Sequence, residues 1–269
     1  MKSRLLVAAL LVPVLYLVLL SGFADFFLLA LLASVALGLA SLELCTMLRP
    51  YGPFVPATFV PVVLAPLMAW RMAEVGIVLA MIATIPLIMV FHGISTERKE
   101  PLGAIVATMM PVAYMVPAGG LLIILRQAEA GFDLVLLLMA AVFLNDTGAY
   151  FTGRAIGKHK LSPRISPNKS IEGFVGGLVV GTFIMWYGHF LVEGGGQKVL
   201  SGWEALAIGL AVGMSTPLGD LFESLLKRSA GVKDSGSLLG EHGGVLDRVD
   251  ALLVAIPVMY IGCFFAGAL

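Results

Sequence analysis

Charged residues are scarce in this chain. Only 13% of its 269 residues are Asp, Glu, Lys or Arg, and the acids and bases balance to a formal net charge of zero. Hydrophobic residues make up 59% of the chain, and the mean hydropathy is +0.99. An ordinary soluble domain is about 25% charged. No soluble fold could bury this much apolar surface, so the composition predicts an all-α, polytopic integral membrane protein.

Several familiar kinds of site are also missing. Cys45 and Cys263 cannot form a C-x-x-C pair, and the topology predicted below places them near opposite faces of the bilayer, which disfavours a disulfide. The four histidines show no metal-binding spacing, and there is no G-x-x-x-x-G-K-[ST] loop. The chain has no internal repeat, which disfavours a transporter built from inverted repeats.

Apolar stretches of about 20 residues predict membrane spans. We count nine, of which the third is short and either tilted or partly re-entrant. The segment 22–24 resembles a signal-peptide cleavage site, but another apolar stretch follows at once, which favours an uncleaved first span. We divide the chain into N-terminal transmembrane helices (1–130) and a catalytic transmembrane region (131–269). The predicted spans are 5–21, 23–41, 57–70, 75–92, 102–126, 132–152, 173–192, 203–222 and 249–268.

The basic residues predict the orientation of these spans. With nine spans and the N-terminus inside, all 17 Lys and Arg residues face the cytoplasm except Arg71, Arg126 and Lys198. We therefore expect a multi-pass protein of the inner (plasma) membrane, with cytoplasmic catalytic loops and an active site that faces the cytoplasm.

Glycines recur at four-residue spacing late in the chain. Gly173, Gly177 and Gly181 form two overlapping G-x-x-x-G units, and Gly209 and Gly213 form a third. This spacing is typical of helices that pack closely within one chain, which is the favoured interpretation. A homodimer formed through this face is the alternative.

Polar residues gather in two segments, 145–173 and 219–250. In the second, acidic side chains would share one face of a continuing helix, and two more would lie one turn apart at the start of the last span. Carboxylates at the edge of the hydrocarbon are costly, so a function is the default hypothesis. Oxygen ligands favour Mg²⁺ or Mn²⁺ over zinc. The predicted metal ligands are Asp220, Glu223, Asp247 and Asp250.

Basic side chains accompany these carboxylates. Lys227, Arg228, Lys233 and Arg248 would bind anions beside a metal, which is the equipment of phosphoryl or nucleotidyl transfer. Two simpler interpretations remain. A basic loop can lie against anionic lipid headgroups, and an acid at a helix start can serve only the helix dipole.

The segment 145–173 adds further candidates. Asp146 ends an apolar run and could partner a base or bind substrate or metal. Residues 165–170 read as a turn leading into a helix. The backbone N–H groups near Ser170 and Glu172, together with Lys169 and Arg164, could hold phosphate, and a plain helix cap is the alternative.

The two segments contain a long pattern of polar residues and glycines at fixed spacing. Its members are Ser224, Lys227, Arg228, Lys233, Asp234, His242, Gly243, Gly244, Asp247, Arg248 and Asp250, with Gly219, Asp220, Asp146, Thr147, Ala149, Tyr150, Gly153, Arg154, Ile165, Ser166, Pro167, Lys169, Glu172 and Gly173. This pattern closely resembles the signature of the phosphatidate cytidylyltransferases, also called CDP-diacylglycerol synthases. The resemblance covers about residues 140–260 and assigns no site in the first 130 residues. One mild departure is Ser170, where the family commonly has Thr.

The resemblance implies that CTP and phosphatidate react to give CDP-diacylglycerol and pyrophosphate, with Mg²⁺ as cofactor and room for a second cation. It implies a lipid bilayer as partner and no nucleic acid. The alternatives are another CTP-using lipid enzyme, such as a polyprenol kinase or a different cytidylyltransferase, and a cation-coupled transporter. The implied catalytic residues are Asp220, Lys227, Asp247, Arg248 and Asp250. The implied substrate-binding residues are Asp146, Arg164, Ser166, Lys169, Ser224, Arg228, Lys233, Asp234, His242, Gly243 and Gly244.

Overall fold

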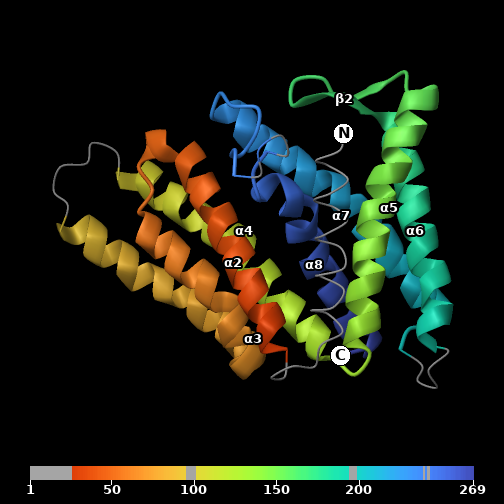
Figure 1. Cartoon of the computed structure of the whole chain (residues 1–269), viewed down its shortest axis with the longest axis horizontal. Coiled ribbons are helices and arrows are strands. Elements are labelled where there is room, and N and C mark those ends of the chain that lie inside the picture. The colour runs from red at the N-terminus through yellow and green to blue at the C-terminus, as the bar shows by residue number, and fades with distance from the viewer. Residues whose placement is uncertain (1–25, 95–100, 194–198, 239, 241–242) are drawn as a thin grey trace. The chain divides into compact units, whose positions relative to one another are not determined.

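The computed structural model describes residues 26–94, 101–193, 199–238, 240 and 243–269 (Figure 1). The chain divides into two compact units. The first comprises Met1–Gln127 and Asp234–Leu246, and the second comprises Ala128–Lys233 and Asp247–Leu269.

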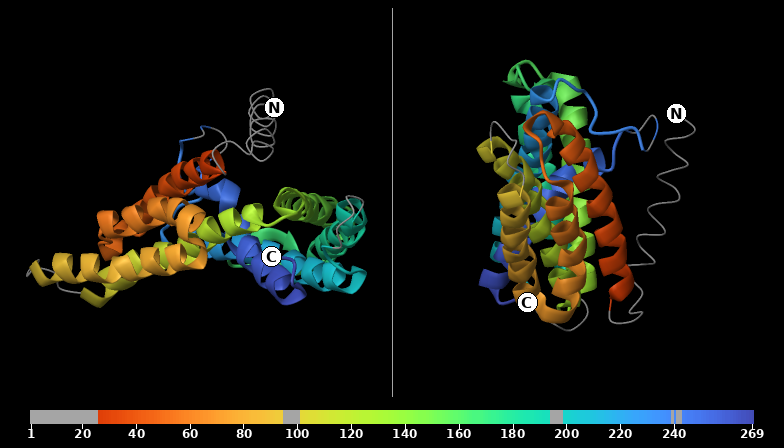
Figure 2. Two further views of the ribbon diagram at one scale, coloured as in Figure 1. Left: turned by 90° about the horizontal axis from the view of Figure 1, so that it is seen from below. Right: turned by 90° about the vertical axis from the view of Figure 1, so that its left-hand side faces the viewer.

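The first unit is built from α2 (Phe27–Met47), the short 3-10 helix η1 (Arg49–Tyr51), α3 (Val55–Ile94) and α4 (Pro101–Gln127). Helix α3 bends sharply at Ala73, whose φ is 48° and ψ is −133°. A Cβ at Gly76 would collide with the backbone of Met68, although residues eight apart in a straight helix are separated by about 12 Å. The two arms of α3 therefore fold back alongside each other, as Figure 2 shows.

Close packing of α4 against its neighbours forms the core of this unit. Gly119 lies against Leu37 of α2, and Gly120 lies against Ile77 of α3. Larger side chains at these glycines would hold the helices apart. Leu44, Val62, Met115 and Ile123 are completely buried in the same core.

The described part of the second unit contains four long helices and one β-hairpin. Its elements are α5 (Gly131–Ile156), β1 (Lys160–Ser162), β2 (Ser166–Ser170), α6 (Ile171–Glu193), α7 (Gly202–Ser229) and α8 (Leu246–Ala266), whose first residue belongs to the first unit. Helices α5 and α6 pack side by side, and the hairpin that connects them lies at their shared end (Figure 1). Strands β1 and β2 are antiparallel.

The four-residue glycine spacing serves packing within this unit. A Cβ at Gly177 would collide with Asn145 of α5, and a Cβ at Gly209 would collide with Met185 of α6. Asn145 is buried and its Nδ2 donates to the carbonyl of Gly213 at 2.9 Å, so it joins α5 to α7. These contacts agree with the favoured interpretation of close helix packing within one chain. They give no support to a homodimer formed through the glycine face.

The predicted multi-pass helical architecture is confirmed, but the count of nine spans is not. Among the described residues, seven helices are long and apolar enough to cross a membrane. The predicted spans 57–70 and 75–92 lie in the two arms of the single element α3. The predicted span 5–21 lies outside the described residues.

The predicted turn at residues 165–170 is wrong. The turn lies at residues 163–165, and the residues from Ser166 to Ser170 form strand β2. Pro163 explains the difference, because its ring fixes the φ that suits an early position in a tight turn. The chain after the turn is then free to pair with β1.

Candidate functional site

Helix α7 carries the first group of predicted site residues. It continues as a helix to Ser229, so the expected shared face is present. Ser224 Oγ donates to Asp220 Oδ1 at 3.2 Å. One turn further along, Lys227 forms an ion pair with Glu223. The local spacing of the sequence thus creates two paired contacts on successive turns.

Lys227 also connects α7 to α8. Its Nζ lies 2.6 Å from Asp247 Oδ1, in the first turn of α8. The side chains of Lys227, Glu223 and Asp247 are only 12%, 1% and 10% exposed. One ammonium therefore lies between two nearly buried carboxylates, and its removal would take away the positive charge next to both of them.

A second lysine connects the hairpin to α7. Lys169, near the end of β2, places its Nζ 2.5 Å from Asp220 Oδ2. This pair is more open to solvent, with side chains 26% and 38% exposed. An exposed pair contributes little to stability, so both groups can exchange partners at small cost.

Three carboxylates from three helices face a common region. Asp146 of α5, Asp220 of α7 and Asp250 of α8 are close enough to interact electrostatically. Gly219 makes this approach possible, because a Cβ there would collide with the carbonyl oxygen of Asp250. The crossing of α7 and α8 at this glycine brings backbone against backbone and concentrates negative charge beside it.

The donor chemistry of this region fits a hard divalent cation. Asp146, Asp220 and Asp250 offer only carboxylate oxygens, which Mg²⁺ prefers. The Oε1 atom of Glu223 is buried and has no hydrogen-bond partner among the described residues. In that same part of the chain, no three Asp, Glu, His or Cys side chains converge as a group that could hold a metal ion. In the arrangement seen here, Lys169 pairs with Asp220, and Lys227 pairs with Glu223 and Asp247.

The β-hairpin is fixed to the start of α6. Glu172 accepts hydrogen bonds from the backbone N–H groups of Lys158 (3.1 Å) and His159 (3.2 Å). Its Oε1 also lies 2.6 Å from His159 Nδ1. Ser170 Oγ accepts a hydrogen bond from the N–H of Gly173 at 3.1 Å, which is the geometry of a helix cap. These contacts hold the strand that presents Lys169.

The remaining basic candidates are exposed. Arg164 lies in the turn of the hairpin, and Lys233 follows the end of α7. Arg228 Nη1 makes a long contact of 3.4 Å to the carbonyl of Val232. Arg248 lies in the first turn of α8 and is exposed. All four can reach an anion in solution. Ser166, the candidate at the start of β2, is half-buried.

Three of the predicted site residues lie in the described part of the first unit. Asp234 is exposed, Gly244 is buried, and Gly243 has a φ of 75°, which glycine adopts without strain. His242 lies outside the described residues. The structure therefore gathers the candidates on α5, β2, α7 and α8 in one unit and leaves the segment 234–246 in the other.

Sequence reasoning missed one residue of the first unit. Glu43 of α2 accepts hydrogen bonds from Ser235, Val245 and Leu246, which flank the glycines and the histidine of the predicted site. Its signal in the sequence is that it is the only charged residue between Phe27 and Met47. An ionisable residue in an apolar span is itself a reason to suspect a function.

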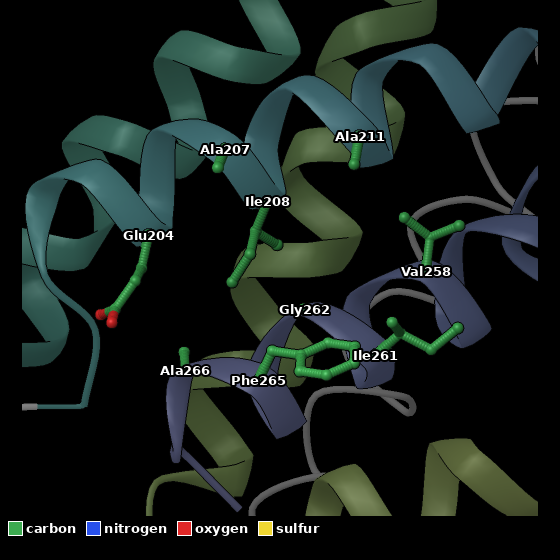
Figure 3. Close-up of a pocket in the computed structure, with 9 residues that line it drawn as sticks. All are labelled: Glu204, Ala207, Ile208, Ala211, Val258, Ile261, Gly262, Phe265 and Ala266. Carbon is green, nitrogen blue, oxygen red and sulfur yellow. The ribbon is translucent and has the colours of Figure 1, made fainter.

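An apolar cavity of about 380 Å³ lies between α7 and α8 (Figure 3). Its lining comes from residues 204–211 and 258–266, toward the other ends of these helices from the carboxylates. Its one charged lining residue, Glu204, is engaged in a reciprocal capping box with Ser201 at the start of α7. The cavity is thus separate from the charged region.

Comparison with known proteins identifies related sequences. A profile of the cytidylyltransferase family matches residues 2–266. Curated proteins named phosphatidate cytidylyltransferase are similar to this chain. Those of Staphylococcus saprophyticus and Staphylococcus haemolyticus are 40% and 41% identical over 153 residues. The matched segment is 57% of this chain and 56% of each relative, so the chain spans little more than half the length of these relatives.

Proposed function

Because the chain belongs to the cytidylyltransferase family, we propose that it is a phosphatidate cytidylyltransferase, which transfers CMP from CTP to phosphatidate. The observation that carries this proposal is the charged region in which Lys169, Asp220, Lys227, Asp247 and Asp250 come together. The similar staphylococcal proteins are named phosphatidate cytidylyltransferases, which supports the choice of substrates.

The reaction joins two anions. An oxygen of the lipid phosphate forms a bond with the α-phosphorus of CTP. The bond between that phosphorus and the oxygen bridging to the β-phosphate breaks, and pyrophosphate leaves with the electron pair. The attacking phosphate is already ionised at neutral pH, so no strong base is needed. Positioning and charge compensation carry the rate.

The residues divide this work between them. Asp220 and Asp247, with Asp250 and Glu223, would hold Mg²⁺, which when bound supplies positive charge to phosphate oxygens. The exposed basic residues would bind the CTP phosphates, and arginine suits this because its planar group makes two parallel hydrogen bonds. Asp146, Ser166 and Lys169 would complete the binding region from the other segment. The exposed basic residues are Arg164, Arg228, Lys233 and Arg248.

The membrane location suits an amphipathic acceptor lipid. The seven apolar helices found among the described residues support a multi-pass protein, and the bacterial relatives support the plasma membrane. We propose that the charged region faces the cytoplasm, where CTP is found. A reporter fused after Leu269 should then be external. A cytoplasmic signal would contradict the proposed orientation.

The direct test uses purified protein in detergent with CTP, Mg²⁺ and phosphatidate. We expect CDP-diacylglycerol and pyrophosphate in equal amounts. Parallel reactions contain a polyprenol or a polyprenyl phosphate in place of phosphatidate. Product formed only with a prenyl lipid would point to a different CTP-using lipid enzyme, and no product with any of these lipids would refute the proposal.

A second experiment tests direct transfer. Enzyme, Mg²⁺, CTP and labelled pyrophosphate are incubated after all lipid phosphate has been removed. A direct reaction needs both substrates bound together, so no label should enter CTP. Strong exchange without lipid would show a covalent nucleotidyl-enzyme, and His242 would be the first residue to replace.

A further inference from the structure

Helix α2 contains one charged residue, and its surroundings are unusual. Glu43 lies near the C-terminal end of α2, whose other residues are apolar or weakly polar. A carboxylate at such a position costs free energy unless it is well compensated. In this structure the compensation comes from a segment nearly 200 residues later in the chain, within the same unit.

Both carboxylate oxygens of Glu43 are engaged. Oε1 accepts from the backbone N–H of Val245 at 2.9 Å, and Oε2 accepts from the backbone N–H of Leu246 at 2.9 Å. Oε2 also accepts from Ser235 Oγ at 3.1 Å. The first N–H groups of a helix have no partner within it, and Leu246 begins α8. Glu43 supplies those partners from another helix.

Two glycines adapt the segment to this carboxylate. A Cβ at Gly236 would collide with Oε1 of Glu43, and a Cβ at Gly244 would collide with Oε2 and with Ser235 Oγ. The chain passes Glu43 at residues 235–236 and again at residues 244–246. One side chain therefore holds both ends of the segment 234–246.

We propose that Glu43 is a positioning residue for the candidate active site. Its carboxylate fixes both ends of the segment 234–246. It thereby fixes the conformation of the backbone that leads directly into Asp247 and Arg248. The segment also carries Asp234 and Gly243, which the sequence predicts as substrate-binding residues. This inference rests on the proposed function for its consequence in turnover, whereas the contact itself is independent of that function.

A carboxylate is the group that this arrangement needs. Three donors converge on it, and it has only acceptor atoms. In Glu43→Gln, the amide nitrogen would face a donor, and the single remaining oxygen cannot serve all three donors. The variant keeps the volume of the side chain but cannot accept all three hydrogen bonds. Displacing a group next to the chemistry by about 1 Å can cost 100-fold in rate.

The kinetic test compares Glu43→Gln with Glu204→Gln. Both changes remove a charge from a carboxylate that accepts backbone N–H groups at a helix start, but Glu204 serves α7, at the end of that helix far from Asp220. We expect kcat to fall about 10- to 100-fold in Glu43→Gln and less than twofold in Glu204→Gln. The KM for phosphatidate should change less than twofold. If Glu43→Gln only lowers the melting temperature and keeps the wild-type kcat, the positioning role is refuted.

Hydrogen exchange measures the contact without turnover. We expect the amides of Val245 and Leu246 to exchange at least tenfold faster in Glu43→Gln and unchanged in Glu204→Gln. If wild-type protein makes no CDP-diacylglycerol, the proposed function fails while exchange still decides whether Glu43 holds the segment. Unchanged exchange in the variant refutes the inference, even if the wild type is active.

Ser235→Ala provides a milder variant should Glu43→Gln not fold. It removes one of the three hydrogen bonds and leaves the carboxylate in place. We expect about a threefold fall in kcat and faster exchange at Val245. When both variants fold, the double variant should be no slower than Glu43→Gln alone, because the two changes remove the same contact. Additive losses, or a wild-type kcat in Ser235→Ala, would contradict the proposal.

Discussion

Replacing Lys227 with methionine tests how much the charged region depends on one ammonium group. Methionine keeps most of the length and the apolar part of the side chain. The change removes the positive charge that lies between Glu223 and Asp247. Those carboxylates are 1% and 10% exposed, so water cannot take over the role of the lysine.

The size of the effect follows from burial. Removing one partner of a buried ion pair costs about 3–5 kcal/mol, because the other charge is left uncompensated. Removing one partner of an exposed pair costs about 0–1 kcal/mol. Lys169→Met provides that matched comparison, since its pair with Asp220 is partly exposed. At about 2–4 °C per kcal/mol, Lys227→Met should lower the melting temperature by about 6–20 °C and Lys169→Met by at most about 4 °C.

The assay is thermal unfolding of the purified variants in one detergent. Adding Glu223→Gln to Lys227→Met should restore part of the loss, because it removes one of the two carboxylates that had paired with the lysine. If Lys227→Met melts as high as Lys169→Met, the bridge between α7 and α8 does not stabilise the protein. If the double variant melts lower than Lys227→Met alone, uncompensated charge is not the cause of the loss.

Three further predictions concern single positions. Asp220→Asn and Asp247→Asn remove a charge while nearly keeping shape, and each should lower turnover by orders of magnitude; near-normal turnover at saturating Mg²⁺ would contradict the metal assignment. Ser170→Ala removes the cap of α6 and should cost about 1 kcal/mol in a melting experiment while turnover is kept; a raised CTP requirement would show a phosphate ligand instead. Gly219→Ala should lower kcat, because its Cβ would push α8 away from α7, whereas Gly103→Ala, where a Cβ meets no atom within 4 Å, should have wild-type kcat.

Local spacing predicted the arrangement on α7 because neighbours on one helix face are set by the helix itself. Once the helix continues to Ser229, Ser224 must lie one turn from Asp220, and Lys227 one turn from Glu223. The break between the predicted spans 57–70 and 75–92 could also be predicted from neighbouring residues alone, because Arg71 and Glu74 interrupt an apolar run. The roles of the site residues in catalysis remain predictions.

Contacts between distant segments could not be predicted in this way. The sequence of α2 shows a lone Glu43 but contains no information about which backbone groups would compensate it. The reversal of α3 at Ala73 has no glycine or proline at the bend itself, so composition predicted a break and not its geometry. The pairing of Lys169 with Asp220 depends on where the hairpin folds, and that depended on a turn predicted in the wrong place.

The contacts of Glu43 also have a consequence for biogenesis. Its partners Ser235 and Leu246 follow it by 192 and 203 residues. At a synthesis rate of about 5–20 residues per second, helix α2 is made roughly 10–40 s before the groups that compensate its carboxylate. During that interval the newly made helix carries an acid without its final hydrogen-bond donors. A polypeptide that stalls before these donors have been made cannot close this contact, so the segment that leads into Asp247 takes its position only after Leu246 has been added to the chain.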